Sequence, residues 1–594
     1  MRHLQGTYAT IERPVTGIAR LIGGASLSVL IGLMPTSTFA ETITPSEASD
    51  TPHLAWVDQG LDLTPLMAPD NVDAVSAFAP PRNLVDDIAL TQAIAARLAT
   101  ALEDESTLFA SDRERKAVAS FYQARDFAPI WVSQGRLTIA GNGAATRLEL
   151  AADDGLDPAD YDAPPANFGL TRALDAETLA HTELKLAASI IRYARDARGA
   201  RINPDVLGEF VDIKRDLPNR RDVLQTVAAA GDTNAALQAY NPQHGGYQRL
   251  RERLIALRDT PVDTEQVVIE GGPLLKPGMR DERVPDLRIR FDLPVPQGDT
   301  DRVYDTTLVT AVKAFQADND LTVDGIIGPQ TLAVMNGDLA MTADDIIVNM
   351  ERWRWLPSEL GAHHVFVNVP QYHLDVVSDG ETVFDTRVIV GTYKTQTPLF
   401  SDEIEHLVVN PSWNVPRSIA GRSIIPAVRR DPTYLVDRDF AVYMNVGGRF
   451  QPVDPASINW DAVRPEALRF RQRPGSSNAL GDVKFMFPNK HAVYLHDTNG
   501  RGLFRSPARA LSNGCVRVEN PIAFSEALLT LETNLNGNSV ERRIGGGEAY
   551  LNLDRHVPVH LAYFTAVVDE DGTARVFNDI YGHDRRMKQL LAAD

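Results

Sequence analysis

Residues 491–521 read HAVYLHDTNGRGLFRSPARALSNGCVRVENP and contain Cys515, the single cysteine among 594 residues. His496 stands nineteen residues before this cysteine, at the end of an alternating apolar run. That alternation predicts a strand with Tyr494 and His496 on one face. Gly514 allows a tight turn directly before the cysteine, which can return Cys515 to the side of His496. We interpret the stretch as a cysteine nucleophile with a histidine base.

The chemistry of this interpretation depends on removing the thiol proton. A thiol becomes a strong nucleophile only as the thiolate, and a free cysteine has a pKa of about 8.5. A neighbouring imidazole can accept the proton and then stabilise the thiolate. The turn can also direct the N–H groups of Gly514 and Cys515 at one point, as an oxyanion hole requires. The alternative is that Cys515 is a small buried apolar residue, the common fate of a lone cysteine.

This stretch resembles the catalytic motif of the L,D-transpeptidases, which cross-link peptidoglycan, through HDT at 496–498 and SNGCVR at 512–517. The phrases VYLHDT and GCVRVEN resemble in particular the large periplasmic branch of that family. Many members have a second histidine just before the glycine, where this chain has Asn513, so His496 is the sole candidate base. We expect a backbone carbonyl to orient its imidazole, because Asp497 would point away from His496 on a continuing strand.

The resemblance implies acyl transfer on peptidoglycan stem peptides, without a cofactor. Cys515 would attack the carbonyl of the third stem residue, and His496 would transfer the proton. The amine of a second stem would then resolve the acyl-enzyme as a 3→3 cross-link. Water or another amine could resolve the same intermediate, which would make the protein an L,D-carboxypeptidase or an attachment enzyme. The residues that we expect at the substrate are Tyr494, Trp413, Arg517 and Ser512, although Arg517 could equally be a structural partner of a carboxylate.

The composition favours several ordinary domains: 594 residues are 44% hydrophobic and carry a net charge of −20. This acidic balance argues against a nucleic-acid partner. One cysteine excludes an internal disulfide. We expect no metal, because His496 has no second histidine at a ligand spacing, and Pro558 between His556 and His560 disfavours a helix there. The sequence does not identify a protein partner.

Residues 1–40 have the layout of an export signal, in which basic residues precede an apolar stretch and Thr38-Phe39-Ala40 offers a cleavage site. The apolar stretch, 21–34, is short for a spanning helix, which needs about 20 residues, although the long basic start leaves an uncleaved anchor open. We expect a periplasmic protein without a stable membrane span after cleavage. Residues 41–84, rich in Pro, Ser, Thr and Asp, predict a flexible linker.

Two helical regions are expected next. Residues 85–260 carry apolar residues at helical spacing and resemble the scaffold domain of the large L,D-transpeptidases through DGLDPADY at 154–161. Residues 270–337 contain AVKAFQ and LTVDGIIGPQTL and resemble the three-helix peptidoglycan-binding module. A helical spacer without a ligand is the alternative for that module. A protein of another class, which binds the wall through this module and catalyses nothing, is the alternative for the whole chain.

The C-terminal region, 345–585, contains runs rich in Val, Ile and Phe and predicts a mostly β catalytic domain, so the whole chain is expected to be multidomain α+β. Its segment 412–480 is too long for an ordinary loop and carries ten arginines against six acidic residues. With Trp413, this segment suits a substrate that bears carboxylates. In the family, the corresponding insertion is a lid over the donor site. The alternative is that these arginines pair with local aspartates on a solvated face.

Overall fold

The computed structural model describes residues 87–592, except 104–107, 166–167, 170–173, 260–266, 268, 271, 299, 320, 336–340, 532–534 and 537. The expected export signal, 1–40, and linker, 41–84, lie outside the described residues. None of the described helices is long and apolar enough to cross a membrane.

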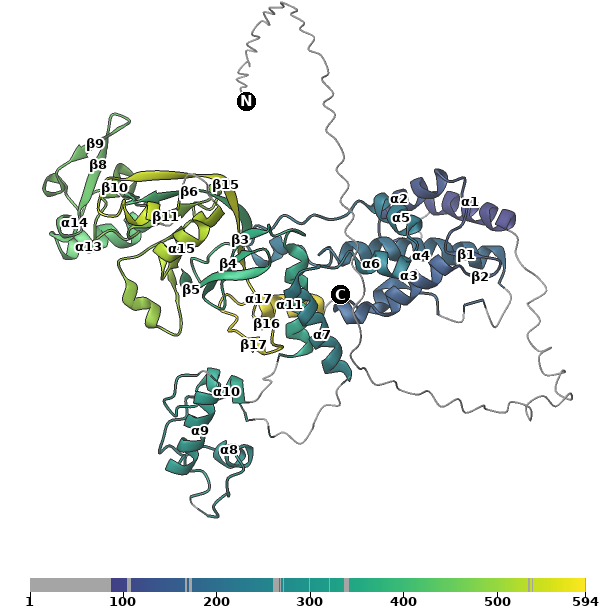
Figure 1. Cartoon of the computed structure of the whole chain (residues 1–594), viewed down its shortest axis with the longest axis horizontal. Coiled ribbons are helices and arrows are strands. Elements are labelled where there is room, and N and C mark those ends of the chain that lie inside the picture. Colours follow the sequence, from purple (N-terminus) through teal and green to yellow (C-terminus); the bar gives the residue numbers. More distant parts are fainter. Residues whose placement is uncertain are drawn as a thin grey trace, which may run out of the picture. The chain divides into compact units, whose positions relative to one another are not determined.

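The described part of residues 87–259 is mainly helical (Figure 1). The helix α4 (Ala176–Asp196) is its centre, because it buries Leu184, Ile190 and Ile191 completely. Burying side chains of this size stabilises the fold by roughly 1.5–3 kcal/mol each. The other helices and the small hairpin are α1 (Asp87–Glu103), α2 (Asp112–Gln123), β1 (Val132–Ser133), β2 (Arg136–Leu137), α3 (Ile139–Glu149), α5 (Arg220–Ala229), α6 (Thr233–Gln238) and α7 (Gly245–Asp259).

A small helical unit with its own apolar core follows. Asp305 caps α9 (Thr306–Asp318), since its carboxylate accepts a hydrogen bond from the Leu308 N–H at 3.0 Å. The buried amide of Gln316 binds the following loop, accepting from the Gly325 N–H at 2.8 Å. The helices, which lie beside one another in Figure 1, are α8 (Val284–Arg290), α9 (Thr306–Asp318) and α10 (Pro329–Met335).

Nine strands of the C-terminal region form one sheet in the order β13-β5-β14-β12-β11-β6-β15-β3-β4. Because β4 also pairs with β5, the sheet closes into a barrel from β5 round to β4. Phe524 of α15 (Pro521–Leu528) contacts Phe485 in the apolar core, with 4.4 Å between ring centroids. The strands are β3 (His363–Asn368), β4 (His373–Ser378), β5 (Glu381–Gly391), β6 (Phe400–Val409), β11 (Val483–Met486), β12 (Leu495–His496), β13 (Ala510–Ser512), β14 (Val516–Val518) and β15 (Ala549–Ala562).

The strand β12 is shorter than the predicted run of 492–496. Ala492 has a φ of 54°, in the left-handed region that strands do not use. The side chain of Asn489 holds the turn at this point, because its amide donates to the carbonyls of Phe487 and Val493 at 2.6 and 2.9 Å. Only Leu495 and His496 therefore join the ladder.

The segment 412–480 is a folded subdomain with its own apolar core, which we call the lid. Its four strands pair in the order β7-β10-β8-β9. Arg429 and Arg473 form ion pairs with Asp461 and Asp439, as the solvated-face alternative expected. The lid elements, grouped around β8 and β10 in Figure 1, are β7 (Trp413–Asn414), α12 (Arg417–Ile419), α13 (Ile425–Arg430), α14 (Tyr434–Asp437), β8 (Phe440–Val446), β9 (Arg449–Val453) and β10 (Leu468–Gln472).

Two helices and a hairpin lie outside the barrel strands. The helix α11 (Ala343–Trp355) begins with a capping box, in which Thr342 and Asp345 exchange hydrogen bonds. Asp345 also forms an ion pair with Lys588 of α17 (His583–Leu591) at 2.6 Å. The hairpin consists of β16 (Ala566–Val568) and β17 (Ala574–Val576).

Candidate active site

Strand pairing brings the two sequence motifs together. The strands β12 and β14 are parallel neighbours, with Leu495 opposite Val516 and His496 opposite Arg517. Leu495 and Val516 are 0% and 1% exposed and belong to the barrel core. Because side chains alternate along a strand, His496 and Arg517 point to the opposite face. Cys515 directly precedes β14 and lies close enough to Arg517 and Tyr494 for these groups to shift one another's pKa.

The turn before the cysteine is closed by its own side chains. Ser512 Oγ donates to the Cys515 carbonyl at 2.6 Å and accepts from the Gly514 N–H at 3.1 Å. Gly514 has a φ of +116°, which favours glycine at this position. We expected Ser512 at the substrate and the Gly514 N–H in the oxyanion hole. In this conformation, however, both groups are engaged within the turn.

The imidazole of His496 is oriented by main chain, which confirms the expectation. Its Nδ1 lies against the carbonyl of Asp497, and because a carbonyl can only accept, Nδ1 carries the proton and Nε2 is free to act as a base. The carboxylate of Asp497 instead binds Arg501 and the Asp482 N–H. Burial, together with the nearby Arg517 and Lys484 cations, lowers the pKa of His496 to about 3.

Cys515 is half-buried and packs against the barrel core. Burial raises the pKa of its thiol to about 11, although the Tyr494 backbone N–H and the Arg517 cation act in the opposite direction. The thiol and the imidazole are therefore both neutral near pH 7. The site does not hold a preformed thiolate–imidazolium pair, so proton transfer has to accompany nucleophilic attack.

Tyr494 connects the lid to this face of the barrel. Its pKa is raised by burial and by the adjacent Cys515, while a side-chain hydrogen bond with Trp413 of the lid lowers it. Tyr494 also lies at the edge of the His496 ring, with 5.6 Å between ring centroids. The expected substrate residues Trp413 and Tyr494 are thus brought to the same place as the candidate base.

Arg517 places a positive charge beside the thiol. Its Nε is buried and has no hydrogen-bond partner among the described residues, and no ion pair in the described part of the chain involves this side chain. The alternative role, pairing with a structural carboxylate, therefore lacks a partner there. A buried guanidinium without a counter-charge suits a carboxylate from a ligand.

Sequence reasoning missed Lys484. This residue lies opposite His496 in the pairing of β11 with β12, so the two side chains share a face. Its Nζ lies 5.8 Å from the centroid of the Tyr494 ring, and burial lowers its pKa. The alternation within VKFM at 483–486 could have placed Lys484 opposite the core, but only the strand register shows that it neighbours His496.

Three family models match separate regions of the chain. Residues 116–254 match "Scaffold domain", residues 289–335 match "Putative peptidoglycan binding domain", and residues 362–535 match "L,D-transpeptidase catalytic domain". The chain is thus a multidomain protein with helical scaffold and peptidoglycan-binding domains beside a mostly β catalytic domain, as its sequence predicted. The model matched by residues 362–535 is that of the YkuD family.

A named relative has a similar description. The chain is 38% identical over 245 residues to a Haemophilus influenzae protein described as "Putative L,D-transpeptidase". That match covers 41% of this chain and 48% of the relative, so the chain spans about half of the relative's length.

Solved structures with some similarity include an L,D-transpeptidase from Mycobacterium smegmatis, at 11% identity over 34% of this chain and 58% of that one, with a TM-score of 0.18. Another is an L,D-transpeptidase from Xylanimonas cellulosilytica, at 16% identity over 49% of this chain and 98% of that one, with a TM-score of 0.15.

Proposed function

We propose that this protein forms 3→3 cross-links between peptidoglycan stem peptides through an acyl-enzyme on Cys515. The observation that supports the proposal most is the parallel pairing of β12 with β14, which joins the strand that ends at His496 to the strand that Cys515 directly precedes. The match of residues 362–535 to an L,D-transpeptidase catalytic domain supports the reaction class. The match of residues 289–335 to a peptidoglycan-binding domain supports peptidoglycan as the substrate. Such a substrate supports a location outside the cytoplasm, and we propose the periplasm.

The first half of the reaction forms a thioester. Cys515 Sγ attacks the carbonyl carbon of the third stem residue while His496 Nε2 takes the thiol proton. The imidazolium then gives this proton to the departing D-alanine amine as the C–N bond breaks. Because the imidazole begins neutral, it can accept the proton at any pH well above 3.

The second half transfers the acyl group. The side-chain amine of a second stem attacks the thioester carbonyl and loses a proton to His496 Nε2. The C–S bond breaks, and the thiolate recovers that proton from the imidazolium. The new amide is the cross-link, and the thiol and imidazole return to their initial neutral states.

The Cys515 N–H is expected to be the main hydrogen-bond donor to the oxyanion. One such donor lowers the activation free energy by roughly 3–4 kcal/mol. The Gly514 N–H can add to this only after Ser512 Oγ releases it. We therefore assign Ser512 a positioning role in the turn. Arg517 is proposed to bind a substrate carboxylate, and Trp413 with Tyr494 to form the wall between lid and barrel.

Intact-mass spectrometry with a carbapenem tests the nucleophile. The wild-type chain should gain the mass of one carbapenem, whereas Cys515→Ala should gain none and His496→Gln should react at least about 100-fold more slowly. Thr182→Val, an exposed change on α4, is the matched control and should react like wild type. Acylation of Cys515→Ala would overturn the assignment of the nucleophile.

Purified stem tetrapeptides test the acceptor. A cross-linked dimer with release of D-alanine is the expected product. Tripeptide alone would show that water resolves the acyl-enzyme, which would make the protein an L,D-carboxypeptidase. A wall-binding protein that catalyses nothing would release no D-alanine and would retain wall binding in Cys515→Ala.

A further inference from the structure

A cavity of about 570 Å³ lies where the chain segment after α4 crosses the end of the barrel. That segment is fixed to the barrel by main-chain hydrogen bonds, from the Leu399 N–H to the Phe210 carbonyl at 2.8 Å and from the Asp212 N–H to the Leu399 carbonyl at 2.9 Å. None of the residues proposed above for catalysis lines the cavity. Its volume is in the range of sites that enclose a small organic molecule.

The walls of the cavity are mostly apolar. Trp355 and Phe564 are 2% and 1% exposed, so very little of their surface meets water even on the cavity side. An apolar body placed here would bury the apolar surface that the lining still exposes, at about 25 cal/mol for each Å². The apolar lining includes Leu207, Ile213, Trp355, Leu399, Phe400 and Phe564.

One side of the cavity contains an unused polar atom. His583 is 4% exposed, and its buried Nε2 has no hydrogen-bond partner among the described residues. Burial lowers the pKa of this imidazole to about 4, so it is neutral near pH 7. The hydroxyl of the neighbouring Tyr563 is already engaged, because it donates to Asp579 at 2.8 Å and accepts from the Tyr581 N–H at 2.9 Å. His583 Nε2 is therefore a single neutral hydrogen-bonding point, which a ligand reaches once the side chains that now cover it shift.

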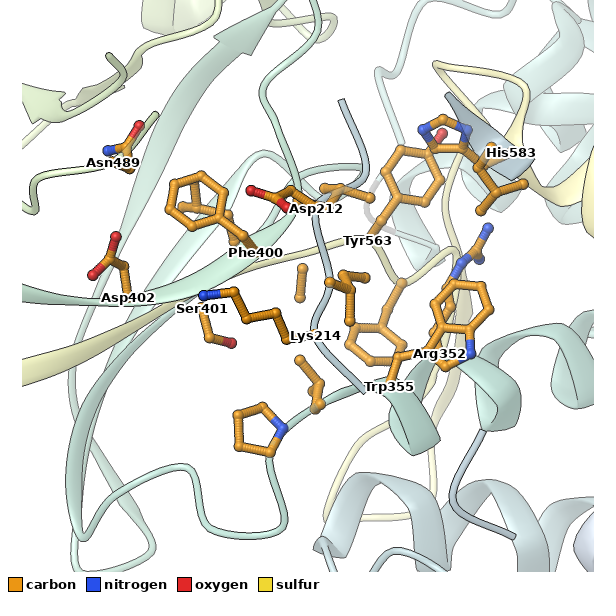
Figure 2. Close-up of a pocket in the computed structure, with 18 of the residues that line it drawn as sticks. Asp212, Lys214, Arg352, Trp355, Phe400, Ser401, Asp402, Asn489, Tyr563 and His583 are labelled. Carbon is orange, nitrogen blue, oxygen red and sulfur yellow. The ribbon is translucent and has the colours of Figure 1, made fainter. Parts of the chain in front are cut away.

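The other side of the cavity carries a cation, Lys214, near the Asp402 carboxylate, whose pKa it lowers. Figure 2 shows the Lys214 side chain directed toward the side on which Asp402 and Asn489 lie, away from His583 and Tyr563. Lys214 is exposed, and no ion pair joins it to a carboxylate in the described part of the chain. Asp212 is already paired with Lys490 at 2.7 Å and with His491 at 3.1 Å. Asp402 accepts the Glu403 N–H at 2.9 Å, and burial raises its pKa.

We propose that this cavity binds an anionic amphiphile with an apolar body and a neutral hydrogen-bonding group at its far end. The anionic head binds Lys214 at the mouth, the body fills the space between Trp355 and Phe400, and the far group bonds His583 Nε2. The site is separate from Cys515, so it stands whether or not the proposed cross-linking reaction is correct.

Two matched fatty acids test the ligand chemistry. Their affinities for the full chain are measured by calorimetric titration at concentrations below those at which they form micelles. 12-Hydroxydodecanoate has both polar ends, and dodecanoate lacks the far hydroxyl. We expect one molecule bound per chain, with the hydroxylated acid about fivefold tighter, the usual net gain of one hydrogen bond. Dodecan-1-ol, which lacks the anion, should bind about threefold more weakly than dodecanoate.

Three variants locate the binding. Ile213→Trp fills the cavity from the connecting segment and should abolish binding of both acids. His583→Phe should remove the fivefold preference for the hydroxylated acid, and Lys214→Gln should bring dodecanoate down to the affinity of dodecan-1-ol. Carbapenem acylation at Cys515 and the unfolding midpoint, both unchanged in Ile213→Trp, would show that the fold is retained.

The proposal fails if neither acid binds the wild-type chain at 1 mM, on the order of the weakest specific affinities. It also fails if Ile213→Trp binds both acids like wild type, because the ligand then occupies another surface. Equal affinities of the two acids for the wild-type chain would remove the role of His583. Should His583→Phe not fold, this comparison of acids on the wild-type chain still decides that role.

Discussion

At the scale of single residues, the pKa values of the catalytic pair set a pH dependence. With the Cys515 pKa raised to about 11, the thiolate fraction at pH 7 is about 300-fold below that of a free cysteine, whose pKa is about 8.5. We expect iodoacetamide to alkylate Cys515 correspondingly slowly, at a rate that rises about tenfold per pH unit from pH 7 to 10. His496 adds no titration above pH 5, because its pKa is lowered to about 3.

Quenched samples analysed by intact mass give these rates. Arg517→Gln should slow alkylation further at every pH, because the Arg517 cation lowers the thiol pKa. A rate that reaches a plateau below pH 8 would contradict the prediction, since it would indicate a thiolate already stabilised by His496.

Thr397 braces the turn that carries the thiol. Its Oγ1 donates to the Gly514 carbonyl at 2.8 Å and accepts from the Gly391 N–H at 2.9 Å. Thr397→Val keeps the shape but leaves both buried main-chain groups without a partner, at a cost of roughly 1–3 kcal/mol. We expect carbapenem acylation of Cys515 to slow about tenfold as the turn loosens. Thr182→Val is again the control, and acylation at the wild-type rate in Thr397→Val would contradict a bracing role.

The sequence was sufficient to select the candidate pair but not to describe its surroundings. The alternation before His496 is a local signal and predicted a strand that ends at this residue, as β12 does. The glycine before Cys515 is another and predicted a turn, which Gly514 forms with a φ of +116°. Lys484 was missed because its proximity to His496 depends on strand register. The occupied N–H of Gly514 was missed because it depends on how one turn closes onto Ser512.

At the scale of elements, one carboxylate fastens the lid to the barrel. Glu548, directly before β15, accepts hydrogen bonds from the Ser412 N–H at 2.8 Å and the Ser412 hydroxyl at 3.1 Å. It also forms an ion pair with Arg471 of β10 at 3.2 Å. Glu548 therefore holds the lid near both of its ends, next to the strand that contains Trp413.

Glu548→Ala should loosen the lid without unfolding the barrel. Hydrogen exchange of 440–446 and 468–472 should become about tenfold faster, as expected when roughly 1–2 kcal/mol of local stability is lost. Exchange in β3, which pairs with β4 and with residues 559–562 of β15, should not change. Glu466→Ala removes an exposed lid carboxylate and serves as the control. Lid exchange at the wild-type rate in Glu548→Ala would mean that other contacts hold the lid.

Helices and strands could be predicted from the sequence where the hydrophobic pattern extends over many residues. The helices of 85–260 and the cap of α9 follow from apolar spacing and from Asp305. The lid was expected as a long basic insertion. Its four-stranded sheet was not predicted, because Phe440, Leu468 and Phe470 meet only after strands that are distant in sequence have paired. Non-local pairing of this kind leaves little periodic signal in a short segment.

At the scale of the whole molecule, a buried polar network joins α11 to the helical region. Arg354 is 1% exposed and forms an ion pair with Glu351, itself fully buried, at 3.0 Å. The same guanidinium donates to the Tyr247 hydroxyl at 3.1 Å and to the Asp154 carbonyl. The sequence motif ERWRWLP at 351–357 contains both Glu351 and Arg354. It does not show that Arg354 binds the Tyr247 hydroxyl and the Asp154 carbonyl.

Removing one member of this network should destabilise the protein strongly. Arg354→Met leaves the Glu351 charge buried without its partner, and such a change costs about 3–5 kcal/mol. The double change Glu351→Gln with Arg354→Met should recover part of this loss, because no uncompensated charge remains. Arg97→Met, which breaks the largely exposed pair with Glu177, should change the unfolding free energy by less than about 1 kcal/mol. Urea unfolding followed by tryptophan fluorescence measures all three. If Arg354→Met costs no more than Arg97→Met, water must reach Glu351, and the network would then contribute little to the join between α11 and the helical region.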